Sequence, residues 1–133
     1  MPTIEIGAQY TVETVVDSTN IASKVGSGLI DVFATPMMIA QMELAASSCI
    51  AASLDEGQAS VGTKIDVSHS AATPIGMKVS ATATVTCVDR RRVDFTVTAR
   101  DEAGEIGSGV HTRFIIDVER FMEKTNAKLE DNI

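Results

Sequence analysis

A strict alternation of apolar and polar residues in the second half of the chain limits the folds that this sequence can adopt. In the segment 77–87 every odd position is apolar and every even position is polar. Successive side chains of a β-strand point to opposite faces of a sheet, so this pattern predicts a strand with one buried face. The alternation returns in 93–100 and 106–117, after short turns at 89–92 and 101–104. The three runs predict an antiparallel β-meander.

The third strand of this meander carries two candidate functional residues. Its apolar face is predicted to hold Ile106, Val110, Phe114 and Ile116. His111 and Arg113 have the opposite parity, so we expect them on the polar side of the strand, with His111 in contact with solvent. Arg113 there is either a surface charge or a ligand for phosphate or carboxylate, and its spacing does not decide between these roles.

Two more strands are indicated outside the meander. In the segment 4–12 the apolar residues occupy every second position. In the segment 61–69 the side chains also alternate between two faces, with Ile65, Val67 and His69 on one of them. β-Branched residues, which favour strands, dominate both segments. His69 therefore shares a face with two apolar residues and is expected to point toward the core. An inward histidine of this kind is either a hydrogen-bonded core residue or a catalytic group.

A long helix is predicted between the first strand and the other four. The segment 34–54 is rich in Ala, Met and Leu, which favour helices. Thr35 is expected to cap this helix, Pro36 suits its first turn, and Gly57 supplies the stop. Because the segment is apolar nearly all round, we expect the helix to be buried. A second, short amphipathic helix is predicted at 119–129.

The elements thus follow one another as strand, loop, long helix, four strands and a terminal helix. One antiparallel five-stranded sheet wrapped around a central helix accounts for this order, which makes the fold class α+β. A chain of 133 residues has the size of one domain. Since no internal repeat or linker divides it, we expect residues 1–133 to form a single domain, with 130–133 as a loose polar tail.

The charge of the chain limits its partners. A net charge of −7 and a pI near 4.7 repel nucleic-acid phosphates and anionic membrane surfaces. A phosphorylated small molecule would need a local basic patch, which the net charge does not exclude. The N-terminal segment lacks a secretory signal pattern, and 32–54 is too polar for a membrane span. We therefore expect neither a nucleic-acid nor a membrane partner.

The two cysteines are expected to be free thiols. Cys49 and Cys87 lie inside apolar patterns, and their spacing does not fit a metal site. Buried free thiols suit a reducing cytoplasm, so a cytoplasmic protein without a metal is expected.

Glu43 is an unusual residue in the long helix, because it is the only charged residue between Asp31 and Asp55. Burying a lone carboxylate is costly, so this side chain is expected to be paired, protonated or facing a cavity. The alternative is a helix face that is exposed to solvent.

Thr35, Glu43 and His69 together suit acyl transfer. A hydroxyl attacks or holds an intermediate, an imidazole moves protons, and a carboxylate attacks or orients. Thr35 and Glu43 are eight residues apart, about 12 Å along a helix. A site that contains both therefore needs a bridging group, a distorted first turn, or two subunits with their helices side by side. Spacing alone leaves the function open.

Four sequence blocks, 25–43, 61–63, 69–76 and 109–114, carry a family resemblance. Taken in this order, they resemble the fluoroacetyl-CoA thioesterase-like branch of the hotdog superfamily. The motifs that carry the resemblance are Ala-Thr-Pro followed by Glu43, then Val-Gly-Thr, and then His-Ser-Ala-Ala-Thr-Pro-Ile-Gly. The resemblance extends over residues 4–121, nearly the whole chain.

The resemblance implies a hotdog fold and hydrolysis of an acyl-CoA thioester without a cofactor. Thr35, Glu43 and His69 match the catalytic set of the branch, with His69 as the general acid and base and the other two as nucleophile or water-activating groups. Gly62 and Arg113 match residues expected at the substrate. Hotdog proteins of this kind are typically homodimers, or higher even-numbered oligomers, with composite sites at the interface.

Two other functions and the identity of the acyl group stay open at this point. A hotdog hydratase or dehydratase would use a histidine and an acid beside the same thioester, and a non-catalytic acyl-CoA binding module would bind without turnover. The loop 17–31 has no aromatic side chain to close over a small acyl group, so a substrate other than fluoroacetyl-CoA is expected.

Overall fold

The structure, a computed structural model, describes residues 3–131 and contains five strands and three helices in that range. The elements in chain order are β1 (Gln9–Val15), α1 (Ala22–Val25), α2 (Thr35–Ala51), β2 (Gln58–His69), β3 (Lys78–Asp89), β4 (Arg92–Arg100), β5 (Glu105–Asp117) and α3 (Val118–Asp131).

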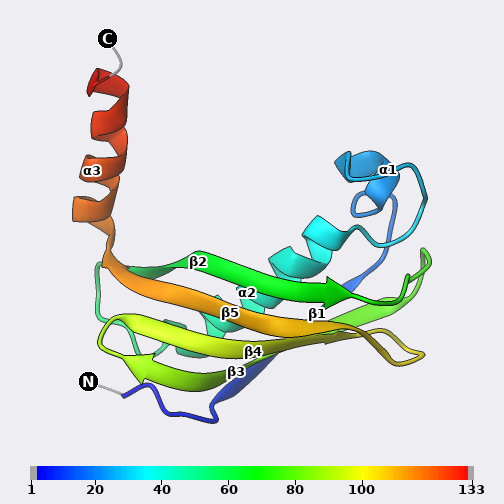
Figure 1. Cartoon of the computed structure of the whole chain (residues 1–133), viewed down its shortest axis with the longest axis horizontal. Coiled ribbons are helices and arrows are strands. Elements are labelled where there is room, and N and C mark those ends of the chain that lie inside the picture. Colours follow the sequence, from blue (N-terminus) through cyan, green and yellow to red (C-terminus); the bar gives the residue numbers. More distant parts are fainter. Residues whose placement is uncertain (1–2, 132–133) are drawn as a thin grey trace.

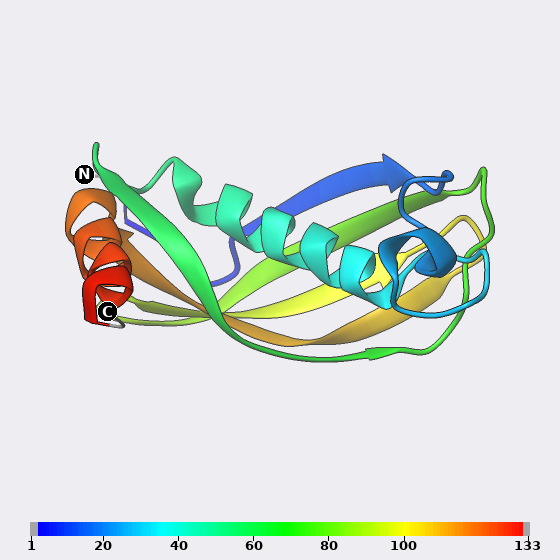
Figure 2. The ribbon, with the colours of Figure 1, turned by 90° about the horizontal axis from the view of Figure 1, so that it is seen from above.

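All five strands form one antiparallel sheet in the order β1-β3-β4-β5-β2. The sheet curves around α2, which lies across its concave face (Figure 1, Figure 2). The predicted meander corresponds to β3, β4 and β5, and the wrapped-sheet arrangement is confirmed. β1 and β2 form the two edges of the sheet.

The core lies between α2 and the sheet. The apolar positions of β3 and β4 are buried, as the alternation predicts, and they pack with the buried face of α2: Met38, Met42, Ala45, Ala46 and Ile50. Complete burial of a side chain such as Met42 contributes about 1.5–3 kcal/mol to folding. The opposite face of α2 is not covered within one chain, since Leu44 is 50 % exposed. The expectation of a helix buried on all sides is therefore wrong for the isolated chain.

Both ends of α2 differ from the sequence prediction. The N-cap residue is Ala34, so Thr35 is the first helical residue and its hydroxyl does not cap the helix. The helix ends at Ala51, before Gly57, which instead has a φ of +83° in the turn that leads into β2. Pro36 lies in the first turn, as predicted.

Ile106 is buried, as predicted, but from Val110 to Phe114 the orientation of β5 is the opposite of the predicted one. His111 and Arg113 are buried, whereas Val110 and Phe114 are partly exposed on the outer face of the sheet. Gly107 lies on the same inner face of β5 as His111 and Arg113, and a Cβ at this position would lie 2.7 Å from the sulfur of Met38. Because glycine contributes no apolar signal, the hydrophobic pattern favoured the wrong face.

The chain ends also depart from the prediction. β1 begins at Gln9, later than the predicted start at residue 4. α3 includes Glu130 and Asp131, so these two residues are helical; residues 132–133 of the predicted tail lie outside the described residues. None of the described helices is long and apolar enough to cross a membrane.

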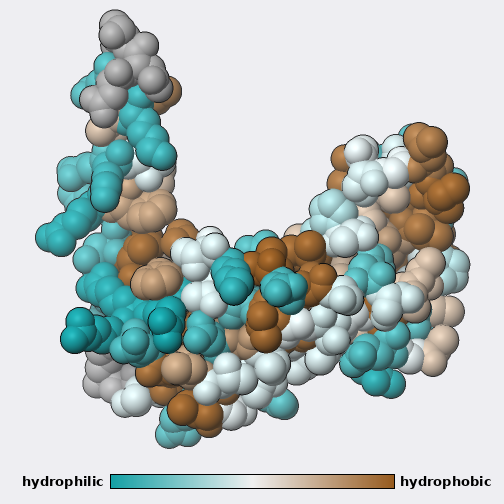
Figure 3. Space-filling view, viewed as in Figure 1, coloured by the Kyte–Doolittle hydropathy of each residue, from teal (hydrophilic) through white to brown (hydrophobic). Residues whose placement is uncertain are grey.

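Two arms give the molecule the shape of a U. The α1 segment stands at one end of the sheet and α3 at the other, and both project beyond β2 in the same direction (Figure 1). The space-filling view shows a hollow between them (Figure 3). The base of α3 is held beside the start of β2 by a hydrogen bond from the N–H of Val118 to the carbonyl of Gly57, 2.9 Å long.

Candidate active site

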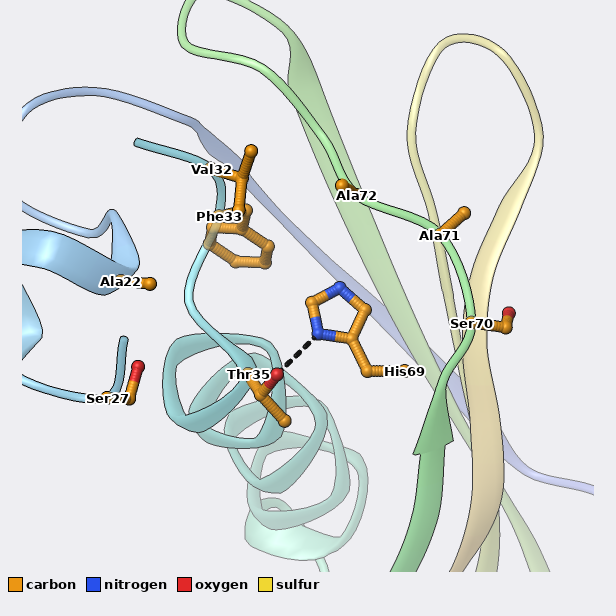
Figure 4. A pocket seen from close by; sticks show the side chains of 9 residues that line it. All are labelled: Ala22, Ser27, Val32, Phe33, Thr35, His69, Ser70, Ala71 and Ala72. Carbon is orange, nitrogen blue, oxygen red and sulfur yellow. Dashed lines mark hydrogen bonds between the residues drawn. The ribbon is translucent and has the colours of Figure 1, made fainter. Parts of the chain in front are cut away.

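The first element of the candidate site is a contact between Thr35 and His69. Thr35 begins α2 and His69 ends β2, and the hydroxyl oxygen of Thr35 lies 2.7 Å from Nδ1 of His69 (Figure 4). The two side chains face a cavity of about 260 Å³. Its other lining residues are Ala22, Ser27, Val32, Phe33, Ser70, Ala71 and Ala72.

The loop before α2 holds Thr35 in place. The N–H of Phe33 donates to the carbonyl of Thr73, and the N–H of Ala34 donates to the carbonyl of Asn20, both over 3.0 Å. Phe33 and Ala34 are also buried. Thr35 therefore follows a segment that is fixed by packing and by backbone hydrogen bonds.

The first turn of α2 leaves one backbone donor without a partner among the described residues. Pro36 has no N–H, and the N–H groups of Met37 and Met38 both donate to the carbonyl of Ala34. The N–H of Thr35 has no acceptor among the described residues. It lies at the positive end of the helix dipole, where a developing negative charge is stabilised.

The environment of His69 favours the neutral imidazole. Burial lowers its pKa below the ordinary value, and an interaction with the backbone of Ala71 partly opposes this effect. Nε2 of the ring is buried and has no hydrogen-bond partner within residues 3–131. A neutral imidazole whose Nδ1 contacts a hydroxyl is suited to take the proton of that hydroxyl.

A second cluster forms around Glu43, near the middle of α2. An oxygen of its carboxylate lies 3.7 Å from Nη1 of Arg113, whose side chain is buried under it. Arg113 also donates from Nε to the hydroxyl of Ser60 and from Nη2 to the carbonyl of Ser60, each over 2.8 Å. Glu43 is thus paired, as predicted, and it lines a cavity of about 270 Å³ together with Gly62, Thr63, Lys64, Ile65 and His111.

His111 belongs to this cluster, although we expected it in solvent. Its Nδ1 lies 2.7 Å from the carbonyl oxygen of Lys64, which only accepts, so Nδ1 carries the proton. Nε2 then accepts from Nη1 of Arg113, 3.3 Å away. Burial lowers the pKa of His111, and the charge of Arg113 adds to this effect, while Lys64 and Glu43 oppose it. His111 is therefore a neutral link between β2 and Arg113.

Gly62 is required by the same cluster. A Cβ at this position would lie 2.7 Å from Oε2 of Glu43 and 3.1 Å from Cε1 of His111. The register of β2 against β5 shifts between Gly62 and Lys64, so Gly62 lies at a bulge. Any side chain there would displace the carboxylate.

The structure thus brings the predicted residues together in two groups, not one. Thr35 and His69 form one group, and Glu43, Gly62 and Arg113 form the other. Among the described residues, neither a hydrogen bond nor an ion pair joins Glu43 to Thr35 or His69. In the same range, no group of three or more His, Cys, Asp or Glu residues is arranged to hold a metal ion. Cys49 and Cys87 are free and half-buried.

Comparison with known proteins identifies the relatives of this chain. A family profile described as fluoroacetyl-CoA-specific thioesterase matches residues 16–119. The fluoroacetyl-CoA thioesterase of Streptantibioticus cattleyicolor is 44 % identical over 98 residues, which cover 74 % of this chain and 70 % of that protein.

Solved structures agree with these sequence matches. The structure of the fluoroacetyl-CoA thioesterase FlK superposes with a TM-score of 0.92 at 35 % identity, covering 96 % of this chain and 98 % of that one. A hot-dog-like protein from Thermanaerovibrio acidaminovorans has a TM-score of 0.84 at 22 % identity, covering 92 % and 91 % of the two chains, and supports the fold alone. The five-stranded sheet around α2 is a hotdog fold.

Proposed function

The chain belongs to the fluoroacetyl-CoA-specific thioesterase family and is an acyl-CoA thioesterase, and we propose that it works through Thr35, His69 and Glu43 at a site shared by two subunits. The observation that carries this proposal is the 2.7 Å contact between the hydroxyl of Thr35 and Nδ1 of His69 in a cavity beside the start of α2.

In the first proposed step, His69 takes the hydroxyl proton of Thr35 and the threonine oxygen attacks the thioester carbonyl carbon. The carbonyl oxygen becomes an oxyanion, and the free N–H of Thr35 at the helix N-terminus supports its charge. The carbon–sulfur bond then breaks, and the CoA thiolate takes the proton from His69.

In the second step, Glu43 accepts a proton from water while the water oxygen attacks the acyl carbon. The bond to Thr35 breaks, and the threonine oxygen takes up the proton that Glu43 received from water, which regenerates both side chains and releases the free acid. Direct attack by water on the thioester gives the same products without an acyl-enzyme. Mass spectrometry of the protein mixed with substrate distinguishes the routes, because only the first adds the acyl mass to Thr35.

A homodimer joins the two groups of residues in this proposal. β2 is an open sheet edge, and the uncovered face of α2 lies beside it, so both features suit a second copy. An antiparallel pairing of two β2 strands about a point between Thr63 and Lys64 places the partner's Gly62 opposite Ile65. The partner's Glu43, which lies beside that glycine, is then closer to His69 than the Glu43 of the same chain.

The dimer also accounts for the exposure of Glu43. Its side chain is 42 % exposed in the isolated chain, although Arg113 beside it is buried. A second subunit over this cavity would remove much of that exposure and would exclude water from the carboxylate.

We further propose an acyl group other than fluoroacetyl, because no aromatic side chain occurs in the loop 17–31. A cytoplasmic location fits the two free thiols.

Thiol release from a panel of acyl-CoA thioesters tests this function. We expect Glu43→Gln and His69→Ala each to lower kcat at least about a hundredfold. Glu56→Gln, at an exposed loop position, is the matched control and should retain the wild-type rate. Wild-type turnover in both active-site variants would remove these residues from the mechanism. Conversion of an enoyl-CoA without thiol release would indicate hydration instead.

A further inference from the structure

A basic cavity lies at the end of the sheet where α3 begins. Its volume is about 220 Å³, with Arg91, Arg120 and Lys124 around an apolar floor. The floor is formed by Ile115, Ile116 and Phe121. In a chain of net charge −7, this is a local concentration of positive charge.

Two of the three basic side chains have no carboxylate partner. Arg91 is 3.4 Å from Asp117, which also lines the cavity, but Arg120 and Lys124 form no ion pair within the described residues. They are four residues apart on α3, so they share one face of the helix. Glu119 and Glu123 lie with Arg120 around a neighbouring cavity and reduce the local field there.

The basic cavity and the Thr35–His69 cavity lie at opposite ends of one chain. α3 begins beside Gly57, at the start of β2, whereas His69 is the last residue of that strand. The strand spans about 36 Å between these points. A single CoA molecule would have to lie along the whole of β2 to reach both cavities of the same chain.

We propose that Arg120 and Lys124, with Arg91, bind the phosphate groups of the CoA whose thioester lies at Thr35 and His69 of the partner subunit. This inference rests on the proposed dimer and its catalytic site. Pairing of β2 strands about their midpoint places His69 opposite the partner's Gln58, and α3 of the partner rises beside that point. Within one chain the α1 and α3 arms stand at opposite ends of the sheet (Figure 1, Figure 3). In such a pair, the α3 arm of each subunit would therefore stand next to the α1 arm of the other.

The chemistry of the cavity fits this part of CoA. The nucleotide end carries a pyrophosphate and a 3′-phosphate, which Arg and Lys recognise through charge-assisted hydrogen bonds. Its adenine ring has an apolar face that suits the floor formed by Ile115, Ile116 and Phe121. The acyl group and the sulfur need no positive charge, and the Thr35–His69 cavity has no basic side chain other than the histidine.

Charge reversal with two substrates tests the site. Arg120→Glu/Lys124→Glu is compared on an acyl-CoA and on the same acyl thioester of N-acetylcysteamine, which has no phosphate. We expect the ratio of kcat/KM for acyl-CoA to kcat/KM for the truncated thioester to fall at least about tenfold. Lys78→Glu/Arg100→Glu, which makes the same change in net charge on β3 and β4, away from the β2 edge, should leave this ratio unchanged. An equal fall in the control, or no fall in the α3 variant, would overturn the inference.

Mixed dimers test whether the phosphates bind across the interface. Chains of the α3 variant are refolded together with His69→Ala chains. If a site takes His69 from one chain and α3 from the other, each mixed dimer has one site in which both are intact. If a site takes both from the same chain, neither site is intact. We expect the mixture to show a component of acyl-CoA hydrolysis with the wild-type KM, beside the component with the raised KM that comes from α3-variant homodimers. A mixture that shows the raised KM alone would contradict binding in trans. Failure of wild-type protein on both substrates would instead refute the proposed function, so the two failures are distinguishable.

Discussion

The hydroxyl oxygen of Thr35 lies 2.7 Å from Nδ1 of His69, although 34 residues separate the two along the chain. The contact joins the first residue of the central helix to the last residue of an edge strand. It gives a neutral imidazole direct access to a hydroxyl at a helix N-terminus, which is the arrangement that acyl transfer needs.

The hydroxyl of Thr35 should be needed for turnover. We expect Thr35→Ala to lower kcat by about a hundredfold or more, because the proton acceptor loses the group it activates. Thr35→Ser keeps the hydroxyl and should retain most of the activity. Thiol release under saturating acyl-CoA measures both variants. Equal activity of the alanine and serine variants would exclude a role for this oxygen.

The rate should depend on the protonation state of His69. Burial lowers the pKa of this imidazole, so it remains neutral to a lower pH than an exposed histidine. Because the neutral form is the base, kcat/KM should rise with pH through a value below 6.5 and then level off. A profile that falls over this interval would mean that the protonated imidazole is the required form.

His111 should make stability depend on pH. Its pKa is lowered in the folded chain, so the unfolded state binds more protons below the ordinary histidine value of 6.5. The free energy of unfolding should therefore decrease as the pH falls through 6.5 and level off below the folded pKa. Denaturant unfolding of His111→Gln should show a weaker pH dependence than the wild type. An unchanged dependence would assign it to other groups.

A single methyl group at Gly62 should disturb the carboxylate site. We expect Gly62→Ala to reduce kcat, because its Cβ would lie 2.7 Å from Oε2 of Glu43 and the carboxylate would have to move. It should also cost about 1–3 kcal/mol of stability, because the Cβ would lie 3.1 Å from Cε1 of the buried His111. Thermal unfolding and thiol release measure the two effects. Gly28→Ala, whose Cβ would meet only the Cβ of Ala22 at 3.4 Å, serves as the control for the stability measurement. Full activity of the Gly62 variant would show that the position of Glu43 is not critical.

Much of the fold follows from local sequence patterns. The alternation in 77–87 and 93–100 predicts β3 and β4 and their buried faces, because a sustained period of two is typical of a half-buried strand. The run of Ala, Met and Leu predicts α2 in the same way. The family relationship, now shown by the comparisons, supplies the hotdog fold and thioester hydrolysis.

The wrong predictions for β5 and for Thr35 have physical causes that the hydrophobic pattern of the sequence does not reveal. Gly107 made the inner face of β5 look polar, so His111 and Arg113 were expected outside. His111 and Arg113 are buried and hydrogen-bonded to each other, and a hydrophobic pattern does not reveal buried polar residues of this kind. Thr35 was expected as a cap because threonine favours that position, yet the cap is Ala34 and the threonine side chain contacts His69. The roles of Thr35, Glu43 and His69 remain predictions.

A mixed-dimer experiment tests the shared site most directly. His69→Ala and Glu43→Gln chains, each inactive alone, are unfolded together and refolded so that half of the dimers contain one chain of each kind. If His69 and Glu43 of a site come from different subunits, one site of every mixed dimer is intact, and the mixture should recover about a quarter of the wild-type kcat. If both residues act within one chain, each site keeps a defect, and a mixture that stays inactive would contradict a site shared by two subunits.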